Sequence, residues 1–227
     1  MSDVYQTLTA PPIYYAAFLD LRGKRCLVVG GGTVAQRKVA GLLDAGAIVT
    51  VVAPNIVPMP DGVHIEQRTF IPQDLNGMML VIAATNDSAA NAAVAREANA
   101  RGIFINVVDD PAICSMILPA VVRREAFCLA ISTGGASPVL ARRLKESFET
   151  QFGEEYGLLI DLLWRLRRQW EPKALDTPLP MEARRQAWEQ VLDLPLLDML
   201  RAGDAVAAEI AAMRILDSVL TQEVEED

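Results

Sequence analysis

The sequence predicts an α/β protein with a Rossmann-type parallel-sheet domain, then a small α+β segment and a C-terminal helical domain. Short apolar runs alternate with amphipathic runs through the first half of the 227 residues, as in consecutive βαβ units. A glycine-rich turn follows the first apolar run, and the pattern is helical from Gly153 onward. We place the domain boundaries at 1–114, 115–150 and 151–227.

The composition is that of a globular chain with a sizeable core, because 52% of its residues are hydrophobic and 22% are charged. No apolar run reaches the roughly 18 residues that a membrane span needs, and the N-terminus lacks the basic start of a signal peptide. We therefore expect a cytoplasmic protein with no membrane partner. The net charge of −8 falls entirely after residue 150 and argues against a nucleic-acid partner.

The cysteines and the single histidine predict neither a disulfide framework nor a metal site. Cys26, Cys114 and Cys128 are odd in number and have no Cys-x-x-Cys spacing. Cys26 and Cys128 lie in apolar, strand-like runs, so we expect both to be buried structural thiols. His64 has no second His or Cys near it in the sequence and is expected at the surface.

The first half contains five predicted strands and two connecting helices. The first strand is buried and ends in the glycines, and Gly46 suits the left-handed position after a helix. The predicted strands are 25–29, 47–53, 64–70, 78–84 and 103–108, and the predicted helices are 34–45 and 88–101.

The second half changes character after an apolar run with Pro119 inside it. A further strand, 127–132, leads into a turn, and Ser137 with Pro138 forms a strong helix start. Three prolines predict a loop over 171–180. The predicted helices are 138–152, 156–170, 180–192, 195–201 and 204–220.

The turn after the first strand has the Gly-x-Gly-x-x-Ala pattern of a dinucleotide-binding site. Gly30 permits the tight turn, Gly32 lets the backbone approach a pyrophosphate, and Ala35 keeps the helix close to the strand. The pyrophosphate would then lie on the first N–H groups of the helix, at Thr33 and Val34. The alternative is a tight turn with no ligand.

The end of the second predicted strand departs from the usual pattern. An acidic residue is expected there to hold the ribose 2′-hydroxyl, but the segment reads Ala53, Pro54 and Asn55. Asn55 or backbone groups near Ala53 could hold the ribose instead. No arginine stands at this strand end to bind a 2′-phosphate, so we expect NAD rather than NADP.

Two further strand ends carry polar side chains that should face the cofactor. Thr85 and Asn86 follow the fourth predicted strand, and Asn106 lies at the end of the fifth. Ligands of open α/β sheets bind at the carboxyl ends of the strands. The alternative for the first pair is a helix N-cap, which Asn86, Asp87 or Ser88 would each satisfy.

Asp109 is the candidate catalytic residue. It follows the fifth predicted strand, where a carboxylate could accept a proton that is lost alongside hydride transfer. Asp110 precedes a proline and is better explained as a turn residue. On the residues alone, a pair of loop aspartates is more often structural than catalytic.

Five segments together resemble the precorrin-2 dehydrogenase / sirohydrochlorin ferrochelatase family, which includes the N-terminal half of bacterial siroheme synthase. They occur in the family's order and spacing, and the resemblance is specific over 13–150 and looser to about residue 220. The segments are Phe-Leu-Asp-Leu-Arg-Gly-Lys-Arg at 18–25, Val-Gly-Gly-Gly-Thr-Val-Ala-Gln-Arg-Lys at 29–38, Ala-Ala-Thr-Asn-Asp at 83–87, Asn-Val-Val-Asp at 106–109, and Ser-Thr-Gly-Gly-Ala-Ser-Pro-Val-Leu-Ala-Arg at 132–142.

The resemblance implies an NAD-dependent oxidation of precorrin-2 to sirohydrochlorin, and in some members the insertion of ferrous iron as a second substrate to give siroheme. It places the family's essential aspartate at Asp109. It places at Thr133 a position that is a phosphorylatable serine in the fused enzyme. It also implies that 115–150 is a dimerisation segment and that the protein is a homodimer.

The resemblance also implies a tetrapyrrole substrate with eight carboxylates, for which the second half offers an anion site. A helix N-terminus with free N–H groups attracts anions, and arginines add charge-assisted hydrogen bonds. The alternative is a capped helix with solvated arginines. The candidate substrate-binding residues are Thr133, Gly134, Gly135, Ser137, Arg142 and Arg123.

Two other functions compete with this interpretation. One is a non-catalytic regulator that binds NAD or a tetrapyrrole on the same fold, against which Asp109 and the intact glycine turn both argue. The other is an unrelated dehydrogenase, which would need a catalytic Lys, His or Tyr at the cleft, and no such residue is obvious in the sequence.

Overall fold

The computed structural model describes residues 12–177 and 179–222. The chain divides into two compact units. The sheet unit runs to Leu118 and includes Gly134–Ala136, and the helical unit contains Pro119–Thr133 and the chain from Ser137 on. The predicted boundaries after residues 114 and 150 stay predictions.

The sheet unit is a five-stranded parallel sheet with the strand order β3-β2-β1-β4-β5. This is the predicted Rossmann-type sheet. Its strands are β1 (Arg25–Val29), β2 (Ile48–Val52), β3 (His64–Glu66), β4 (Leu80–Ala83) and β5 (Phe104–Val107), and its helices are α2 (Thr33–Asp44) and α3 (Ser88–Ala100).

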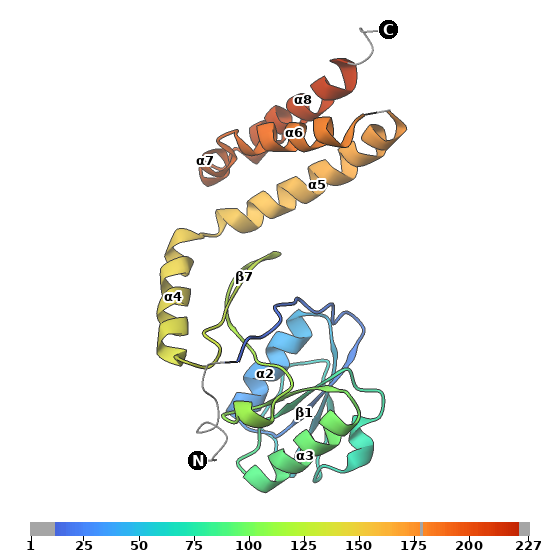
Figure 1. The fold of residues 1–227 in the computed structure, drawn as a ribbon, viewed down its shortest axis with the longest axis vertical. Coiled ribbons are helices and arrows are strands. Elements are labelled where there is room, and N and C mark those ends of the chain that lie inside the picture. The colour runs from blue at the N-terminus through green and yellow to red at the C-terminus, as the bar shows by residue number, and fades with distance from the viewer. Residues whose placement is uncertain (1–11, 178, 223–227) are drawn as a thin grey trace. The chain divides into compact units, whose positions relative to one another are not determined.

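Helices α2 and α3 cover opposite faces of the sheet (Figure 1). Side chains of a strand alternate between the two faces, so Val28 packs with Ala35 and Val39 of α2 while Leu27 packs with Val94 of α3. The central strands β1 and β4 are therefore buried on both faces, which is why their sequences are continuous apolar runs.

The strand order places a crevice at the carboxyl end of β1. The chain leaves β1 through α2 to β2 on one side, and β4 lies on the other side of β1. Such a reversal of strand order opens a crevice at the carboxyl ends of the strands, where ligands of these sheets bind. A ligand site is therefore expected at the loops after β1, β2, β4 and β5.

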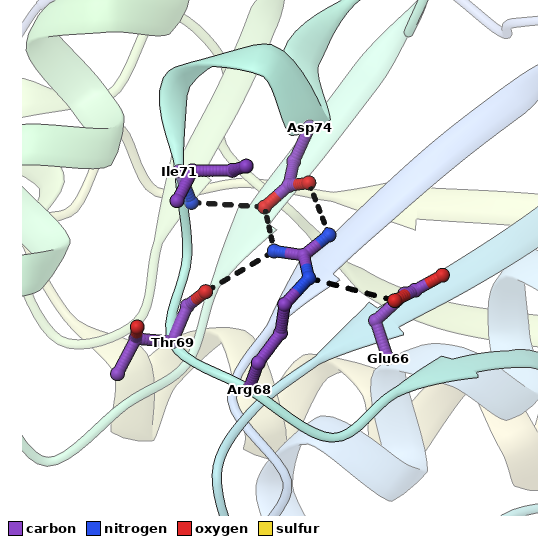
Figure 2. A network of polar contacts seen from close by, with 5 residues as sticks. All are labelled: Glu66, Arg68, Thr69, Ile71 and Asp74. Carbon is purple, nitrogen blue, oxygen red and sulfur yellow. Dashed lines mark hydrogen bonds and ion pairs between the residues drawn. The ribbon is translucent and has the colours of Figure 1, made fainter.

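Strand β3 ends at Glu66, four residues before the predicted end, because Arg68 draws the following chain into a loop (Figure 2). The guanidinium donates two hydrogen bonds to the Asp74 carboxylate, at 2.9 and 2.7 Å, and lies 3.5 Å from the Glu66 carboxylate. Asp74 also accepts the backbone N–H of Ile71 at 2.9 Å. The network closes the loop onto the short 3-10 helix η1 (Pro72–Leu75).

The helical unit combines an antiparallel hairpin with a bundle of helices. Ser137 caps α4 through a hydrogen bond from the Leu140 N–H at 3.1 Å, as predicted. The hairpin strands are β6 (Ala120–Arg124) and β7 (Phe127–Ile131), and the helices are α4 (Pro138–Gln151), α5 (Glu155–Asp176), α6 (Met181–Leu192), α7 (Leu196–Arg201) and α8 (Ala205–Gln222). The short 3-10 helix η2 (Pro111–Ile113) belongs to the sheet unit.

The predicted loop over 171–180 is wrong for its first six residues, because α5 continues to Asp176 with Pro172 inside it. Trp170 and Ala174 lie one turn apart on the buried face of α5, both 1% exposed. The Trp170 indole N–H donates to the Leu216 carbonyl of α8 at 2.8 Å. This burial outweighs the backbone hydrogen bond that the proline removes.

The sequence predicted burial for Cys26 and Cys128 and exposure for His64, and two of these three predictions are confirmed. Cys26 is fully buried in β1, and burial raises its pKa to about 11. His64 is exposed. Cys128 is only half-buried, so the prediction of a buried thiol is wrong there, because a two-stranded hairpin covers its residues less fully than the central strand of a five-stranded sheet does. No helix in the described ranges is long and apolar enough to cross a membrane.

The Arg68 network predicts a stability contribution that depends on pH. Burial alone would raise the Asp74 pKa, but the hydrogen bonds from Arg68 and the Ile71 N–H hold it below its ordinary value of 3.8. A carboxyl group with a lowered pKa stabilises the fold above its unfolded pKa, and the effect disappears as the pH falls through the folded pKa. Arg68→Met should therefore lower the free energy of unfolding at neutral pH, and this loss should shrink as the pH falls below the ordinary Asp74 pKa of 3.8.

Urea unfolding of the sheet unit at several pH values checks this, with Arg96→Met as the control. Arg96 is an exposed arginine of α3, so its removal should leave the free energy of unfolding within about 0.5 kcal/mol. A loss for Arg68→Met that does not change with pH would contradict the role of the Asp74 carboxylate.

Candidate functional site

A cavity of about 450 Å³ opens where β1, β2 and β4 end. Seven of the ten predicted cofactor-binding residues line it, and the other three, Thr33, Val34 and Asn106, are not among its lining residues in the described structure. The lining is Gly30, Gly31, Gly32, Ala53, Pro54, Asn55, Ile56, Val57, Ala84, Thr85 and Asn86. Four of them were not predicted from the sequence: Gly31, Ile56, Val57 and Ala84.

Gly30 and Gly31 let three backbone segments meet at the edge of this cavity. A Cβ at Gly30, whose φ is +128°, would overlap the carbonyl oxygen of Ala84. A Cβ at Gly31 would overlap the carbonyl oxygen of Asn55, and the Gly31 carbonyl accepts the N–H of Val57 at 2.8 Å. These two glycines therefore serve the packing of the loops, and the run of three glycines was the available signal for Gly31.

Gly32 serves the cavity itself. It is the N-cap of α2, and a Cβ added there would meet nothing within 4 Å among the described atoms, so the space beside it is open cavity. No side chain in the described structure caps α2, which leaves the N–H groups at the start of the helix for a ligand. An open approach beside a glycine and an uncapped helix N-terminus fit a pyrophosphate.

The loop after β4 is held by a residue that the sequence analysis did not single out. Asn91 of α3 is 6% exposed, and its side chain takes both backbone groups of Thr85: its amide donates to the Thr85 carbonyl at 3.0 Å, and its oxygen accepts the Thr85 N–H at 3.3 Å. The Thr85 hydroxyl lies 2.8 Å from the same oxygen. The signal for Asn91 was a polar residue on the buried face of an alanine-rich helix.

Of the three candidate N-caps for α3, Asn86, Asp87 and Ser88, the structure uses Asp87. Its carboxylate accepts the N–H groups of Ala89 and Ala90 at 2.9 and 3.1 Å. Because Asp87 caps α3, Asn86 is exposed at the edge of the cavity and remains a candidate for cofactor contact. The Thr85 hydroxyl also accepts the Asp87 N–H at 3.1 Å, so Thr85 contributes mainly through its position.

Asn106 is tied to its own loop. Its side-chain amide donates to the Met116 carbonyl at 3.3 Å, on the face of the sheet that α2 covers. The role of Asn106 in cofactor binding stays a prediction.

Asp109 stands in the turn directly after β5, where its φ is +61°. Aspartate tolerates this left-handed conformation better than most residues. The preceding Val108 is anchored by a hydrogen bond from its N–H to the Ala83 carbonyl at 2.9 Å. The Asp109 side chain is exposed at the carboxyl edge of the sheet, as a group that contacts a substrate must be.

Cys114 braces this turn from inside the sheet unit. Its sulfur accepts the Val107 N–H at 3.0 Å and lies 3.2 Å from the Asp110 carbonyl, to which the thiol can donate. Burial is the main reason why the Cys114 pKa is raised, so the group stays a thiol at neutral pH. Cys114 therefore connects the two sides of Asp109 and fixes the course of the backbone there.

Four of the predicted substrate-binding residues form the turn before α4. The Thr133 hydroxyl accepts the Ser137 N–H at 3.1 Å, and Gly134 and Gly135 have φ values of +62° and +85°. Arg123 and Arg142 are exposed, and the Arg142 guanidinium lies 3.5 Å from the Glu146 carboxylate. An exposed pair of this kind contributes little, so the guanidinium is available to an anion.

Two segments of the chain match sequence profiles of known protein families. Residues 17–120 match the sequence profile of a family described as NAD(P)-binding, and residues 129–151 match that of the central part of a sirohaem biosynthesis protein. The solved structure of SirC, a precorrin-2 dehydrogenase, superimposes with a TM-score of 0.65 at 25% identity, covering 90% of this chain and all of SirC.

Curated relatives agree with these matches. The siroheme synthase of Methylococcus capsulatus is 44% identical over 216 residues, which are 92% of this chain and 45% of that protein. The siroheme synthase of Pseudomonas fluorescens is 42% identical over 202 residues, which are 86% of this chain and 43% of that protein. This chain thus spans less than half the length of these relatives.

The fold and the cavity define a nicotinamide-dinucleotide-binding protein with a Rossmann sheet, and the family match supports NAD as its cofactor. The chain is similar to siroheme synthases over a little less than half of their length, and it shares the fold of a precorrin-2 dehydrogenase.

The different surroundings of Gly30 and Gly32 predict different defects. Gly32→Asp should abolish NAD binding while the melting temperature stays close to wild type, because its side chain enters open cavity and places a negative charge at the pyrophosphate position. Gly30→Ala should lower the melting temperature, because its Cβ would overlap the Ala84 carbonyl oxygen. Calorimetric NAD titration and thermal unfolding of both variants check this. Unchanged NAD affinity in Gly32→Asp would refute the role of the turn.

Asn91 should support both the fold and the cofactor site. Asn91→Leu keeps the size of the side chain but leaves the Thr85 N–H and carbonyl without partners, at a cost of about 1–3 kcal/mol in the free energy of unfolding. Because Thr85 lines the cavity, we expect NAD affinity to fall as well. Asn99→Leu, at an exposed position of the same helix, is the control, and equal NAD affinity in the two variants would exclude Asn91 as a support of the site.

Proposed function

We propose that this chain oxidises precorrin-2 to sirohydrochlorin with NAD, as a dehydrogenase of siroheme biosynthesis. The observation that carries the proposal is the position of Asp109. Its carboxylate stands exposed in a braced left-handed turn at the end of β5, next along the sheet from β4, whose end lines the cofactor cavity. In sheets of this kind the substrate lies at the carboxyl ends of the strands.

Asp109 acts as the proton acceptor of the oxidation. NAD supplies an acceptor for the hydride that leaves a carbon of the substrate. The accompanying proton leaves the substrate for the carboxylate of Asp109, so two electrons and two hydrogens are removed in total. The chain's own contribution is to place that carboxylate, through Val108 on one side and Cys114 on the other.

The surroundings of the cavity favour NAD over NADP. A 2′-phosphate needs a cationic partner near the end of β2, and no Arg or Lys is among the lining residues in the described part of the chain. Arg68, which follows β3, is already held by Asp74 and Glu66. Asn55, exposed in the lining after β2, is the residue that we propose for the ribose.

The carboxylates of the tetrapyrrole require cations and N–H donors. We assign this role to the turn at Thr133, Gly134, Gly135 and Ser137 with Arg123 and Arg142, whose guanidinium groups are exposed. Homodimerisation through 115–150, which would bring such groups from two chains to a substrate, belongs to the same proposal. Sedimentation at micromolar concentration tests the dimer.

Asp109→Asn is the decisive variant, because asparagine also tolerates the left-handed conformation and keeps the size of the side chain. We expect kcat for NADH formation from precorrin-2 and NAD to fall by about 10²-fold or more, as for the loss of a general base. The dissociation constant for NAD should stay within about twofold, since Asp109 is not part of the cavity lining.

Asp110→Asn, one residue further along the same turn, is the matched control and should retain kcat. Wild-type protein that forms no NADH from precorrin-2 would refute the proposed function. That result, together with retained NAD or tetrapyrrole binding, would instead identify the non-catalytic regulator as the function.

Insertion of ferrous iron into sirohydrochlorin is a second activity that the same carboxylate could serve, by accepting the pyrrole protons that the metal displaces. No cluster of three or more His, Cys, Asp or Glu side chains within the described ranges could hold a metal ion on its own. Iron therefore enters this proposal as a substrate. The absorbance change on mixing the protein with sirohydrochlorin and cobalt or ferrous iron decides between one activity and two.

A further inference from the structure

Lys38 is a half-buried cation of α2 whose charge interacts with that of Asp109, the proposed proton acceptor, and the function proposed above gives it no role. It lies in the second turn of α2, the helix that begins at the dinucleotide-binding turn. Its neighbours Ala35 and Val39 are fully buried against the sheet. The stem of Lys38 therefore starts at the edge of the buried face of α2.

The geometry of α2 decides which way Lys38 leans. Residues of a helix follow each other at about 100°, so Gln36 and Lys38 lie about 200° apart, on opposite flanks of the face formed by Ala35 and Val39. The Gln36 amide donates to the Pro58 carbonyl at 2.7 Å, in the chain that follows β2. Because β2 and β4 lie on opposite sides of β1, the Lys38 flank faces β4 and the turn after β5.

Packing and charge place Asp109 on that side. Val108, the residue before Asp109, packs against the core cluster that contains Ala35 and Val39. The charged groups that act on Lys38 are Arg37 of the same helix and Asp109 of the turn after β5. Burial lowers the pKa of Lys38 most, Arg37 lowers it further, and Asp109 raises it in part.

Lys38 and Asp109 nevertheless make no ion pair with each other. Across residues 12–177 and 179–222, neither side chain has a hydrogen bond or an ion-pair partner within 4.0 Å. A half-buried ammonium carries three donors, and leaving them without an anion costs free energy. A ligand that carries an anionic group on one side and a labile hydrogen on the other could therefore satisfy both the cation and the carboxylate.

We propose that Lys38 is a substrate-anchoring residue that binds a peripheral carboxylate of the tetrapyrrole beside Asp109 and so presents the ring to that group. The proposal rests on the proposed function and specifies its substrate site. The cofactor's phosphates are a poor alternative, because Lys38 is outside the cavity lining, which lies at the opposite end of the first turn of α2. A carboxylate at Lys38 fixes the distance between the oxidised carbon and Asp109, which is what selects one position of the ring for reaction.

Sirohydrochlorin binding without NAD tests this proposal directly. Lys38→Met keeps the stem and removes the charge, and should weaken sirohydrochlorin binding by about tenfold or more, the effect of one charge-assisted hydrogen bond. The KM for precorrin-2 should rise by a similar factor, while the dissociation constant for NAD stays within about twofold. Lys38→Arg, which restores a cation, should recover most of the affinity.

Lys24→Met is the matched control, because Lys24 is exposed and precedes β1 at the amino end of the sheet, away from the site. It should bind sirohydrochlorin as wild type does. The affinity of wild-type protein should also fall with added salt more steeply than that of Lys38→Met, since the variant has lost one of the charges that attract the ligand.

The outcomes separate the two proposals. If Lys38→Met binds sirohydrochlorin as tightly as the wild-type protein does, and the wild-type protein forms NADH from precorrin-2, the anchoring role alone is overturned. A variant that binds normally but has lost kcat makes Lys38 a positioning residue for Asp109 and also overturns the anchor. A loss of NAD binding in Lys38→Met makes its role structural. Wild-type protein that neither binds sirohydrochlorin nor forms NADH overturns the proposed function and the anchor with it.

Discussion

The close approach of three backbone segments at the carboxyl edge of β1 is the constraint on which the rest of the sheet unit depends. Gly30 lies against the Ala84 carbonyl and Gly31 against the Asn55 carbonyl, so the loops after β1, β2 and β4 meet without side chains between them. Gly32 then faces open space at the start of α2. Two glycines thus assemble the cavity, and the third leaves it open to a pyrophosphate.

The loops after β3, β4 and β5 are each tied to the scaffold by a side chain outside the cavity lining. Asn91 holds both backbone groups of Thr85, Cys114 braces the turn around Asp109, and Arg68 closes the chain after β3 onto Asp74. Polar groups that are fully paired in this way order a loop without occupying the space it encloses. Of these three ties, the one made by Asn91 bears on the cavity, because Thr85 lines it.

The sheet unit separates recognition by the backbone from recognition by charge. The cofactor cavity is lined by glycine, proline, aliphatic and small polar residues, with no charged side chain among the described lining residues. Asp109 and Lys38 lie outside that lining. A dinucleotide can thus be held largely by N–H groups and a helix terminus.

The sequence by itself determined the parallel sheet, the dinucleotide turn and the position of Asp109 after β5, because those features depend on periodicity and on residues close together in the chain. It misplaced the end of β3 and the end of α5, since Arg68 and Trp170 make the contacts that decide those boundaries with residues of other segments. Only the tertiary structure decided that Asn91 holds Thr85 and that the charges of Lys38 and Asp109 interact. Those pairs join different elements, and a distance between elements is set by how helices pack on the sheet, which no local pattern records.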